Sequence, residues 1–156
     1  DPRANHAMVD AILGMTPAAE MPVGVVEPLM SDIDALMAGD NLGAISDRLL
    51  SYDGENAWLQ KARDGFAHGS KLAAAWIFRQ LNESVHYSLK EVFDTELRLG
   101  ANIMRDPEFA EGVRALLVDK DRQPKWQYDS VHDVPDAVLE TFFQEAEGAP
   151  EMHYPW

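Results

Sequence analysis

The chain has 156 residues and a formal net charge of −14, with 13 Lys and Arg against 27 Asp and Glu. This charge repels nucleic acid and anionic membranes, and no apolar run approaches the roughly 20 residues that span a bilayer. Because 46% of the residues are hydrophobic and none is cysteine, we expect one globular domain in a reducing compartment, without disulfides or thiolate catalysis.

Apolar residues that recur at helical spacing predict two helices near the start of the chain. The first covers residues 4–15 and the second covers residues 26–37, with a surface loop over residues 18–24 between them. Gly39 follows the second helix, at the place where a residue with left-handed backbone often ends a helix.

Polar residues mark the starts of the next helices. Asp40 or Asn41 is placed to cap a third helix, and residues 55–67 carry the apolar stripe of a fourth. Ser70 is placed to cap a longer helix over residues 71–87. We interpret the tryptophans in these two later helices as core anchors rather than stacking platforms. They are Trp58 and Trp76.

The clearest helix signals lie between Ser88 and Trp126. Ser88 and Glu91 form the S-x-x-E pattern of a capping box, in which each side chain bonds the backbone amide of the other residue. Asp106 and Pro107 give a second clean start, because proline at the first helical position loses no hydrogen bond. We expect the helix that follows to bury one apolar face, formed by Phe109, Val113, Leu116 and Leu117.

A last helix begins near Asp133 and Pro135. Its predicted buried residues are Val138, Leu139, Phe142 and Phe143. No segment alternates apolar and polar residues over the length of a strand. The sequence therefore predicts an all-α fold, an irregular bundle of seven or eight helices, with residues 1–148 as a single helical domain and residues 149–156 as a loose tail.

No residue pattern predicts a catalytic or metal site. The five histidines lack the spacing of metal ligands, and without cysteine we expect no metal. The ten glycines stand singly, so no phosphate-binding glycine loop is present. Two polar clusters are interpreted as solvated helix surface rather than as nucleophile and base or as paired carboxylates. They are Glu83, Ser84 and His86, and Glu91, Asp94 and Glu96.

One basic turn stands out against this acidic background. Residues 98–125 hold six Lys and Arg against five Asp and Glu, whereas the rest of the chain holds seven against 22. Lys120, Arg122 and Lys125 give a polyanionic ligand or an acidic partner surface complementary charge, with a merely solvated turn as the alternative. Trp126 either pins this turn to the bundle, which we favour, or flanks a bound anion.

These motifs resemble the C-terminal region of the 3-hydroxyisobutyryl-CoA hydrolases, within the crotonase (enoyl-CoA hydratase/isomerase) superfamily. The likeness is dense over residues 70–143, where the segments that carry it are FRQL, SLKEVFDTELRL, EFAEGVRALLVDK and DKDRQPKW. Two positions depart from the family pattern. Lys71 stands where a proline is common, and Pro135 stands where a polar cap is usual, so the geometry with which those helices begin is open.

The resemblance implies hydrolysis of a short branched 3-hydroxyacyl-CoA thioester in valine breakdown. In the family, two backbone amides hold the developing oxyanion and acidic side chains activate the attack. The resemblance assigns these groups to an N-terminal βαβ-rich half that is absent from this sequence, so we assign no catalytic residue. We expect a C-terminal helical part of such an enzyme, inactive alone, from a chain that opens on Asp1 because it is partial.

Partners and location follow from the same resemblance. We expect the chain to bind the N-terminal crotonase core of its own protein, and an exposed apolar face favours a homo-oligomer. Coenzyme A enters as part of the substrate, and we expect no cofactor. A cytoplasmic location is expected, with the mitochondrial matrix as the alternative. Two other functions stay open: an enoyl-CoA hydratase or isomerase of the same superfamily, and a non-catalytic helical interaction module.

Overall fold

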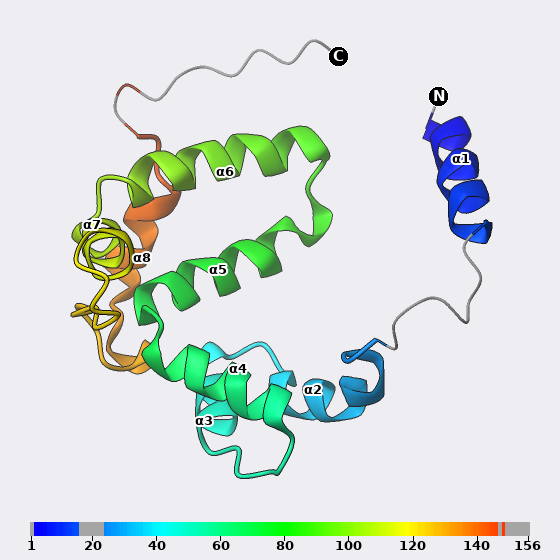
Figure 1. Ribbon diagram of the computed structural model, residues 1–156. Helices are drawn as coiled ribbons and strands as arrows, with labels where there is room; N and C mark the ends of the chain where they lie inside the picture. The colour runs from blue at the N-terminus through cyan, green and yellow to red at the C-terminus, as the bar shows by residue number, and fades with distance from the viewer. Residues whose placement is uncertain (1, 16–23, 147, 149–156) are drawn as a thin grey trace. The chain divides into compact units, whose positions relative to one another are not determined.

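The computed structural model describes residues 2–15, 24–146 and 148 (Figure 1). It divides the chain into two compact units, Asp1–Leu36 and Met37–Trp156. Within the described residues every regular element is a helix and no strand is present, which confirms the predicted all-α class. None of these helices has the length and apolar composition needed to cross a membrane. The predicted tail over residues 149–156 and most of the predicted loop over residues 18–24 lie outside the described residues.

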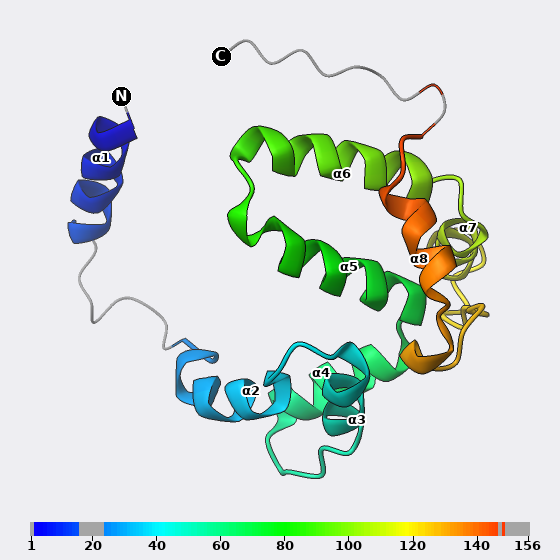
Figure 2. The ribbon, with the colours of Figure 1, turned by 180° about the vertical axis from the view of Figure 1, so that it is seen from behind.

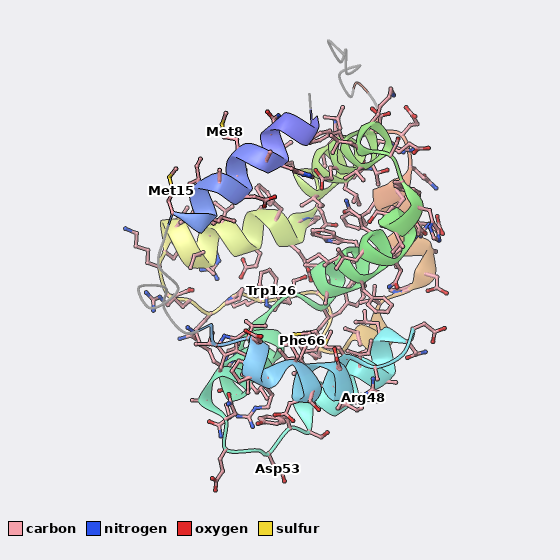
Figure 3. All side chains as sticks on the ribbon, turned by 90° about the vertical axis from the view of Figure 1, so that its right-hand side faces the viewer. Met8, Met15, Arg48, Asp53, Phe66 and Trp126 are labelled. Atoms are coloured by element: carbon pink, nitrogen blue, oxygen red, sulfur yellow. The ribbon has the colours of Figure 1, made fainter. Side chains whose placement is uncertain are left out.

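The first unit contains the two helices predicted near the start of the chain. α1 (Pro2–Gly14) carries Met8, and Met15 follows its last residue; both side chains are labelled in Figure 3. The second helix begins as a short 3-10 turn, η2 (Glu27–Leu29), and continues as α2 (Met30–Met37). Beyond α2, Gly39 has φ of 95°, the left-handed backbone that the sequence predicts there.

Asparagine caps begin the next two helices. The Oδ1 atom of Asn41 accepts a hydrogen bond from the backbone N–H of Ala44 at 2.9 Å and caps α3 (Leu42–Leu50). Asn56 caps α4 (Ala57–His68), which therefore starts two residues later than predicted. Trp58 is 42% exposed in the first turn of α4, so its prediction as a core anchor is wrong. The neighbouring leucine, Leu59, is buried instead.

α5 (Lys71–Glu83) and α6 (Leu89–Ile103) run antiparallel to each other (Figures 1 and 2). The 3-10 turn η3 (Ser84–His86) joins them, so α5 ends before the predicted residue 87. α8 (Asp136–Phe143) packs on both helices. The core cluster comes from one residue of each helix, Leu72, Leu99 and Phe142, and Trp76 packs against it as predicted.

Lys71 caps the preceding helix and leaves the start of its own helix undisturbed. The Oγ atom of Ser70 still accepts a hydrogen bond from the N–H of Ala73 at 2.9 Å. The ammonium of Lys71, a residue that is 4% exposed, donates to three carbonyls at the end of α4, where helical carbonyls lack partners. These acceptors are Phe66, Ala67 and Gly69, at 2.8, 2.9 and 2.8 Å. Burial lowers the pKa of this ammonium, against the raising effect of nearby carboxylates.

Pro135 occupies the cap position of α8 without a side-chain hydrogen bond. Its carbonyl accepts the N–H groups of Val138 and Leu139 at 3.0 and 3.1 Å, so the helix begins normally despite the missing polar cap. At the other end of α8, the Nδ2 atom of Asn102 donates to the carbonyls of Phe142 and Gln144 at 3.0 and 2.9 Å. This asparagine ties the end of α8 to α6.

The helix after Pro107 departs from its predicted packing. Asp106 caps α7 (Pro107–Val113) as expected, but the helix then widens into a π-helical segment, η4 (Arg114–Val118). Its hydrogen bonds join residues five apart, so side chains no longer follow the 3.6-residue period behind the prediction. The predicted buried face is wrong for three residues, which are 45%, 61% and 63% exposed. They are Phe109, Leu116 and Leu117.

The capping box at the start of α6 yields a stability prediction. The Ser88 Oγ atom accepts the N–H of Glu91 at 3.3 Å, and a Glu91 carboxylate oxygen accepts the N–H of Ser88 at 2.7 Å. Replacing Ser88 with alanine should lower the free energy of unfolding by about 1 kcal/mol. Ser88→Thr keeps a hydroxyl acceptor and should lose less. Urea denaturation measures both, and equal losses would contradict the role of the hydroxyl group.

Candidate functional site

A cleft of about 550 Å³ lies within the second unit, beside α5, α7 and η4. Its lining is largely apolar and includes Leu72, Trp76, Ile103, Phe109, Leu116, Leu117 and Phe142. A few polar groups also line it, among them Ser70, Glu108 and Arg122. This volume is in the range of small-molecule pockets, but exposed leucines on its wall are more typical of a surface that another polypeptide covers.

The three predicted ligand residues lie on the loop that follows η4. Lys120, Arg122 and Lys125 are all exposed, and none forms an ion pair with any residue in the described part of the chain. Arg122 lines the apolar cleft, whereas Lys120 and Lys125 are not among its lining residues. The structure thus brings one of the three predicted cations to the cleft and leaves two on the same loop outside it.

The backbone of this loop is unusual. Lys120 and Arg122 both have φ of 57°, and they are the two non-glycine residues with positive φ in the described residues. Left-handed backbone is unfavourable for side chains other than glycine, asparagine and aspartate, so surrounding contacts must hold it. Backbone bonds supply part of this hold, because the N–H of Arg122 donates to the carbonyl of Ala115 at 3.0 Å.

The guanidinium of Arg114 makes most of the other contacts that stabilise this loop. Its Nε and Nη2 atoms donate to the two carboxylate oxygens of Glu111, each at 2.8 Å. Its Nη1 atom donates to Asp119 at 2.6 Å and to Asp121 at 2.7 Å. Nη2 also donates to the carbonyl of Gln123 at 3.1 Å. All five N–H donors of the group therefore have acceptors, and three of these acceptors belong to the loop.

The network shifts the titration of its members. Hydrogen bonds from Arg114, followed by one from the N–H of Lys125 at 2.7 Å, lower the pKa of Glu111 to about 2. Arg114 also lowers the pKa of Asp121, and the N–H of Gln123 adds to that effect. The same carboxylates raise the pKa of Arg114. The charges in this network therefore persist across the neutral range.

Two further contacts fix the end of the loop. One oxygen of the buried Glu108 carboxylate accepts the N–H of Gln127 at 2.6 Å, and the other accepts the hydroxyl of Ser70. The indole N–H of Trp126, a side chain labelled in Figure 3, donates to the carbonyl of His68 at 2.7 Å, at the end of α4. The Trp126 ring also lies over Gly112, where an added Cβ would come within 3.2 Å. Trp126 pins the loop to the bundle, which confirms the favoured interpretation.

Sequence reasoning missed the residues that organise this loop. From the sequence, only the charges of Glu108, Glu111 and Arg114 were counted. These residues nevertheless recur at three-residue spacing along one helix. Such spacing puts side chains on one side of a helix, so it was the available signal. The spacing could not indicate that this side of the helix faces the loop. The loop has irregular backbone, so its residues that bond to the helix follow no period in the sequence.

The polar clusters considered for catalysis have structural partners. Glu91 belongs to the capping box, and Asp94 pairs with Lys90 one turn away at 2.6 Å. Ser84 donates only to the carbonyl of Leu81, at 3.4 Å. Across the described ranges, no group of three or more His, Asp or Glu is placed to hold a metal ion. The arrangement places exposed cations beside an apolar cleft, and the described residues show no nucleophile paired with a base.

Comparisons with known proteins give a consistent result. A sequence profile described as enoyl-CoA hydratase/isomerase matches residues 2–143. The chain is 34% identical over 125 residues to the mitochondrial 3-hydroxyisobutyryl-CoA hydrolase of Danio rerio, and 33% identical over 114 residues to that of Xenopus laevis. These matches cover 80% and 73% of this chain but 32% and 29% of the relatives. The chain thus spans about a third of the length of these curated relatives.

A solved structure agrees with these relatives. The crystal structure of an enoyl-CoA hydratase from Rhodobacter sphaeroides 2.4.1 matches with a TM-score of 0.72 and 26% sequence identity. The match covers 94% of this chain and 44% of that chain. More than half of the hydratase chain therefore has no counterpart in these 156 residues.

The depressed pKa of Glu111 predicts how stability depends on pH. The ordinary pKa of this carboxyl is 4.5 and the folded value is about 2, so the unfolded chain takes up the proton first as pH falls. The contribution of Glu111 to stability is present above pH 4.5 and should be lost progressively between about 4.5 and 2. Urea unfolding at a series of pH values should therefore show a shallower decline for Glu111→Gln than for the unaltered chain.

The matched control for this prediction is Glu96→Gln, which removes an exposed carboxylate of α6. It should leave the pH dependence of the unaltered chain in place. Indistinguishable declines for the two variants would contradict the assignment of the acid-sensitive stability to Glu111.

Proposed function

The chain belongs to the enoyl-CoA hydratase/isomerase family, and from this membership we propose that it is the C-terminal helical part of an enzyme that hydrolyses 3-hydroxyisobutyryl-CoA. The observation that carries the proposal is the similarity, at 34% and 33% identity, to proteins named as 3-hydroxyisobutyryl-CoA hydrolases. Breakdown of valine is the proposed setting of this reaction. The enzyme would convert the thioester to free acid and coenzyme A.

We propose that these helices support and cover a catalytic core that lies elsewhere in the same protein. The support for this division is chemical, because the described residues offer neither a metal site nor a nucleophile paired with a base. The apolar cleft, with Leu116 and Leu117 exposed on its wall, is the surface we assign to that core. With the core in place, residues 1–148 would act as a single helical domain, and the same exposed surface would favour a homo-oligomer.

The basic loop has a separate role in this proposal. Coenzyme A carries phosphate groups, and Lys120, Arg122 and Lys125 are exposed cations without ion-pair partners in the part of the chain described. Arg122 also reaches the cleft, so an anion bound there would lie beside the apolar wall. We propose that the loop receives these phosphates, and an acidic partner surface is the alternative ligand of the same charge.

A second enzymatic function has its own support. The solved structure that resembles this chain is titled an enoyl-CoA hydratase, so hydration or isomerisation of an enoyl-CoA is the runner-up reaction. A non-catalytic helical interaction module is the third candidate, from a different class. A protein that carries these helices without a catalytic core would favour that candidate over both enzymes.

The cytoplasm stays our proposed location, with the mitochondrial matrix as the alternative. The curated relatives named above are mitochondrial proteins, which supports the matrix. Absence of cysteine suits either compartment, since both are reducing.

The isolated 156-residue chain should not hydrolyse 3-hydroxyisobutyryl-CoA above the rate without protein, because we assign bond breaking to residues outside it. A thiol-trapping assay for released coenzyme A measures this, with the full-length protein as the positive control. Turnover by the isolated chain would overturn the division between supporting helices and catalytic core. Turnover of an enoyl-CoA alone by the full-length protein would favour the hydratase.

The cations of the basic loop should contribute to the affinity for coenzyme A. Replacing Lys120, Arg122 and Lys125 together with glutamine in the full-length protein should weaken coenzyme A binding by at least about tenfold, as expected when hydrogen bonds to charged groups are lost. Isothermal titration calorimetry measures the affinity. The control replaces two exposed lysines elsewhere, Lys61 and Lys90, with glutamine and should change binding little. Unchanged affinity in the triple variant would remove the loop from the ligand site.

A further inference from the structure

The loop after η4 separates its acidic side chains from its basic ones. Its sequence alternates acid and base through Asp119, Lys120, Asp121 and Arg122. Neighbouring charges of opposite sign would ordinarily attract one another and leave little net field. In the structure the two aspartates turn to Arg114, at 2.6 and 2.7 Å, and the two bases make no ion pair with any described residue.

We propose that Arg114 is a positioning residue for the anion site. Its guanidinium draws Asp119 and Asp121 away from the adjacent bases and holds the loop in the backbone that presents Lys120 and Arg122 to a ligand. This inference rests on the proposed function, since it assumes that the loop binds phosphate groups of coenzyme A. It goes further by assigning a role to a residue outside the three side chains proposed to bind the phosphates.

The geometry explains why an arginine is suited to this position. A guanidinium carries five N–H donors in a rigid planar fork, and all five donors of Arg114 are used. Glu111 accepts two of them from the helix side, so it fixes the plane of the fork. The other three reach Asp119, Asp121 and the carbonyl of Gln123. A lysine ammonium has three donors on a point charge and could not replace this arrangement.

Strain in the backbone makes the dependence on Arg114 testable. Lys120 and Arg122 both have φ of 57°, a conformation that such residues leave when nothing holds them. Bonds anchored on Glu111, Arg114 and Asp121 surround them, including the N–H of Gln123 to Asp121 at 2.8 Å and the N–H of Lys125 to Glu111 at 2.7 Å. Loss of the guanidinium should therefore release the whole segment rather than one side chain.

The test replaces Arg114 with glutamine in the full-length protein. We expect coenzyme A binding, measured by calorimetry, to weaken by roughly tenfold, the loss that accompanies one hydrogen bond to a charged group. We also expect amides of residues 119–127 to exchange hydrogen faster, measured by mass spectrometry. Combining Arg114→Gln with the triple glutamine variant of the loop should cause no loss beyond that of the triple variant, because Arg114 acts through those bases.

The matched control is Arg79→Gln. Arg79 is another guanidinium that bonds two carboxylates, Glu83 at 2.7 Å and Glu140 at 2.8 Å, but it lies on α5 away from the loop. It should change neither coenzyme A binding nor exchange in residues 119–127. A general effect of losing an arginine network would appear in both variants, so a matching change in the control would overturn the positioning role.

Three further results would overturn the inference. They are unchanged exchange in the Arg114 variant, faster exchange with unchanged affinity, and an additional loss when it is combined with the triple variant. A failure of the proposed anion site can be distinguished from a failure of this inference. If the loop does not bind phosphate, the triple variant alone would bind coenzyme A with normal affinity. In that case Arg114 would have no ligand site to position, and the inference would fall with it.

Discussion

The geometry of the candidate site depends on one guanidinium that is shared between a helix and a loop. Arg114 is fixed by Glu111 on the helix and reaches Asp119, Asp121 and Gln123 on the loop. These charges are partly exposed, and exposed ion pairs contribute little to the free energy of folding. Their effect is on shape, because planar paired hydrogen bonds select one arrangement of an irregular segment that has no periodic backbone bonding of its own.

Neighbouring contacts extend this constraint to the rest of the bundle. Glu108 joins the loop at Gln127 to the start of α5 at Ser70, and Trp126 joins it to the end of α4 at His68. Lys71 then ties the end of α4 to the start of α5 through three carbonyls. The motif DKDRQPKW thus has a structural reason: its acids, its tryptophan and its backbone amides hold the loop to α4, α7 and η4.

The sequence was informative where structure is local. The capping box of Ser88 and Glu91 and the Asp106-Pro107 start were predicted to the residue, because each signal concerns neighbours within one turn. Packing was harder to predict. Leu116 and Leu117 are apolar at the spacing of a core face, yet both are exposed, and a sequence does not distinguish a leucine buried in the core from one at the surface. The π-helical segment added to this error by changing the period of the side chains.

The candidate site was predictable in part for the same reason. The charge pattern of Lys120, Arg122 and Lys125 identified the loop, but its organising residue, Arg114, could not be found because its partners depend on a backbone that turns twice into the left-handed region.

The exposed apolar side chains and the cations of the basic loop differ in the interaction that each offers, which is apolar burial in one case and charge pairing in the other. Full burial of a leucine or phenylalanine side chain contributes about 1.5–3 kcal/mol, whereas an exposed ion pair contributes about 0–1 kcal/mol. A polypeptide that covers Phe109, Leu116 and Leu117 would therefore be held mainly by apolar contact. The cations beside them would add little to that association, and under the proposed function they would serve to select an anion. Because Arg122 is both a loop cation and part of the cleft lining, a polypeptide that covered these residues would lie next to the proposed anion site.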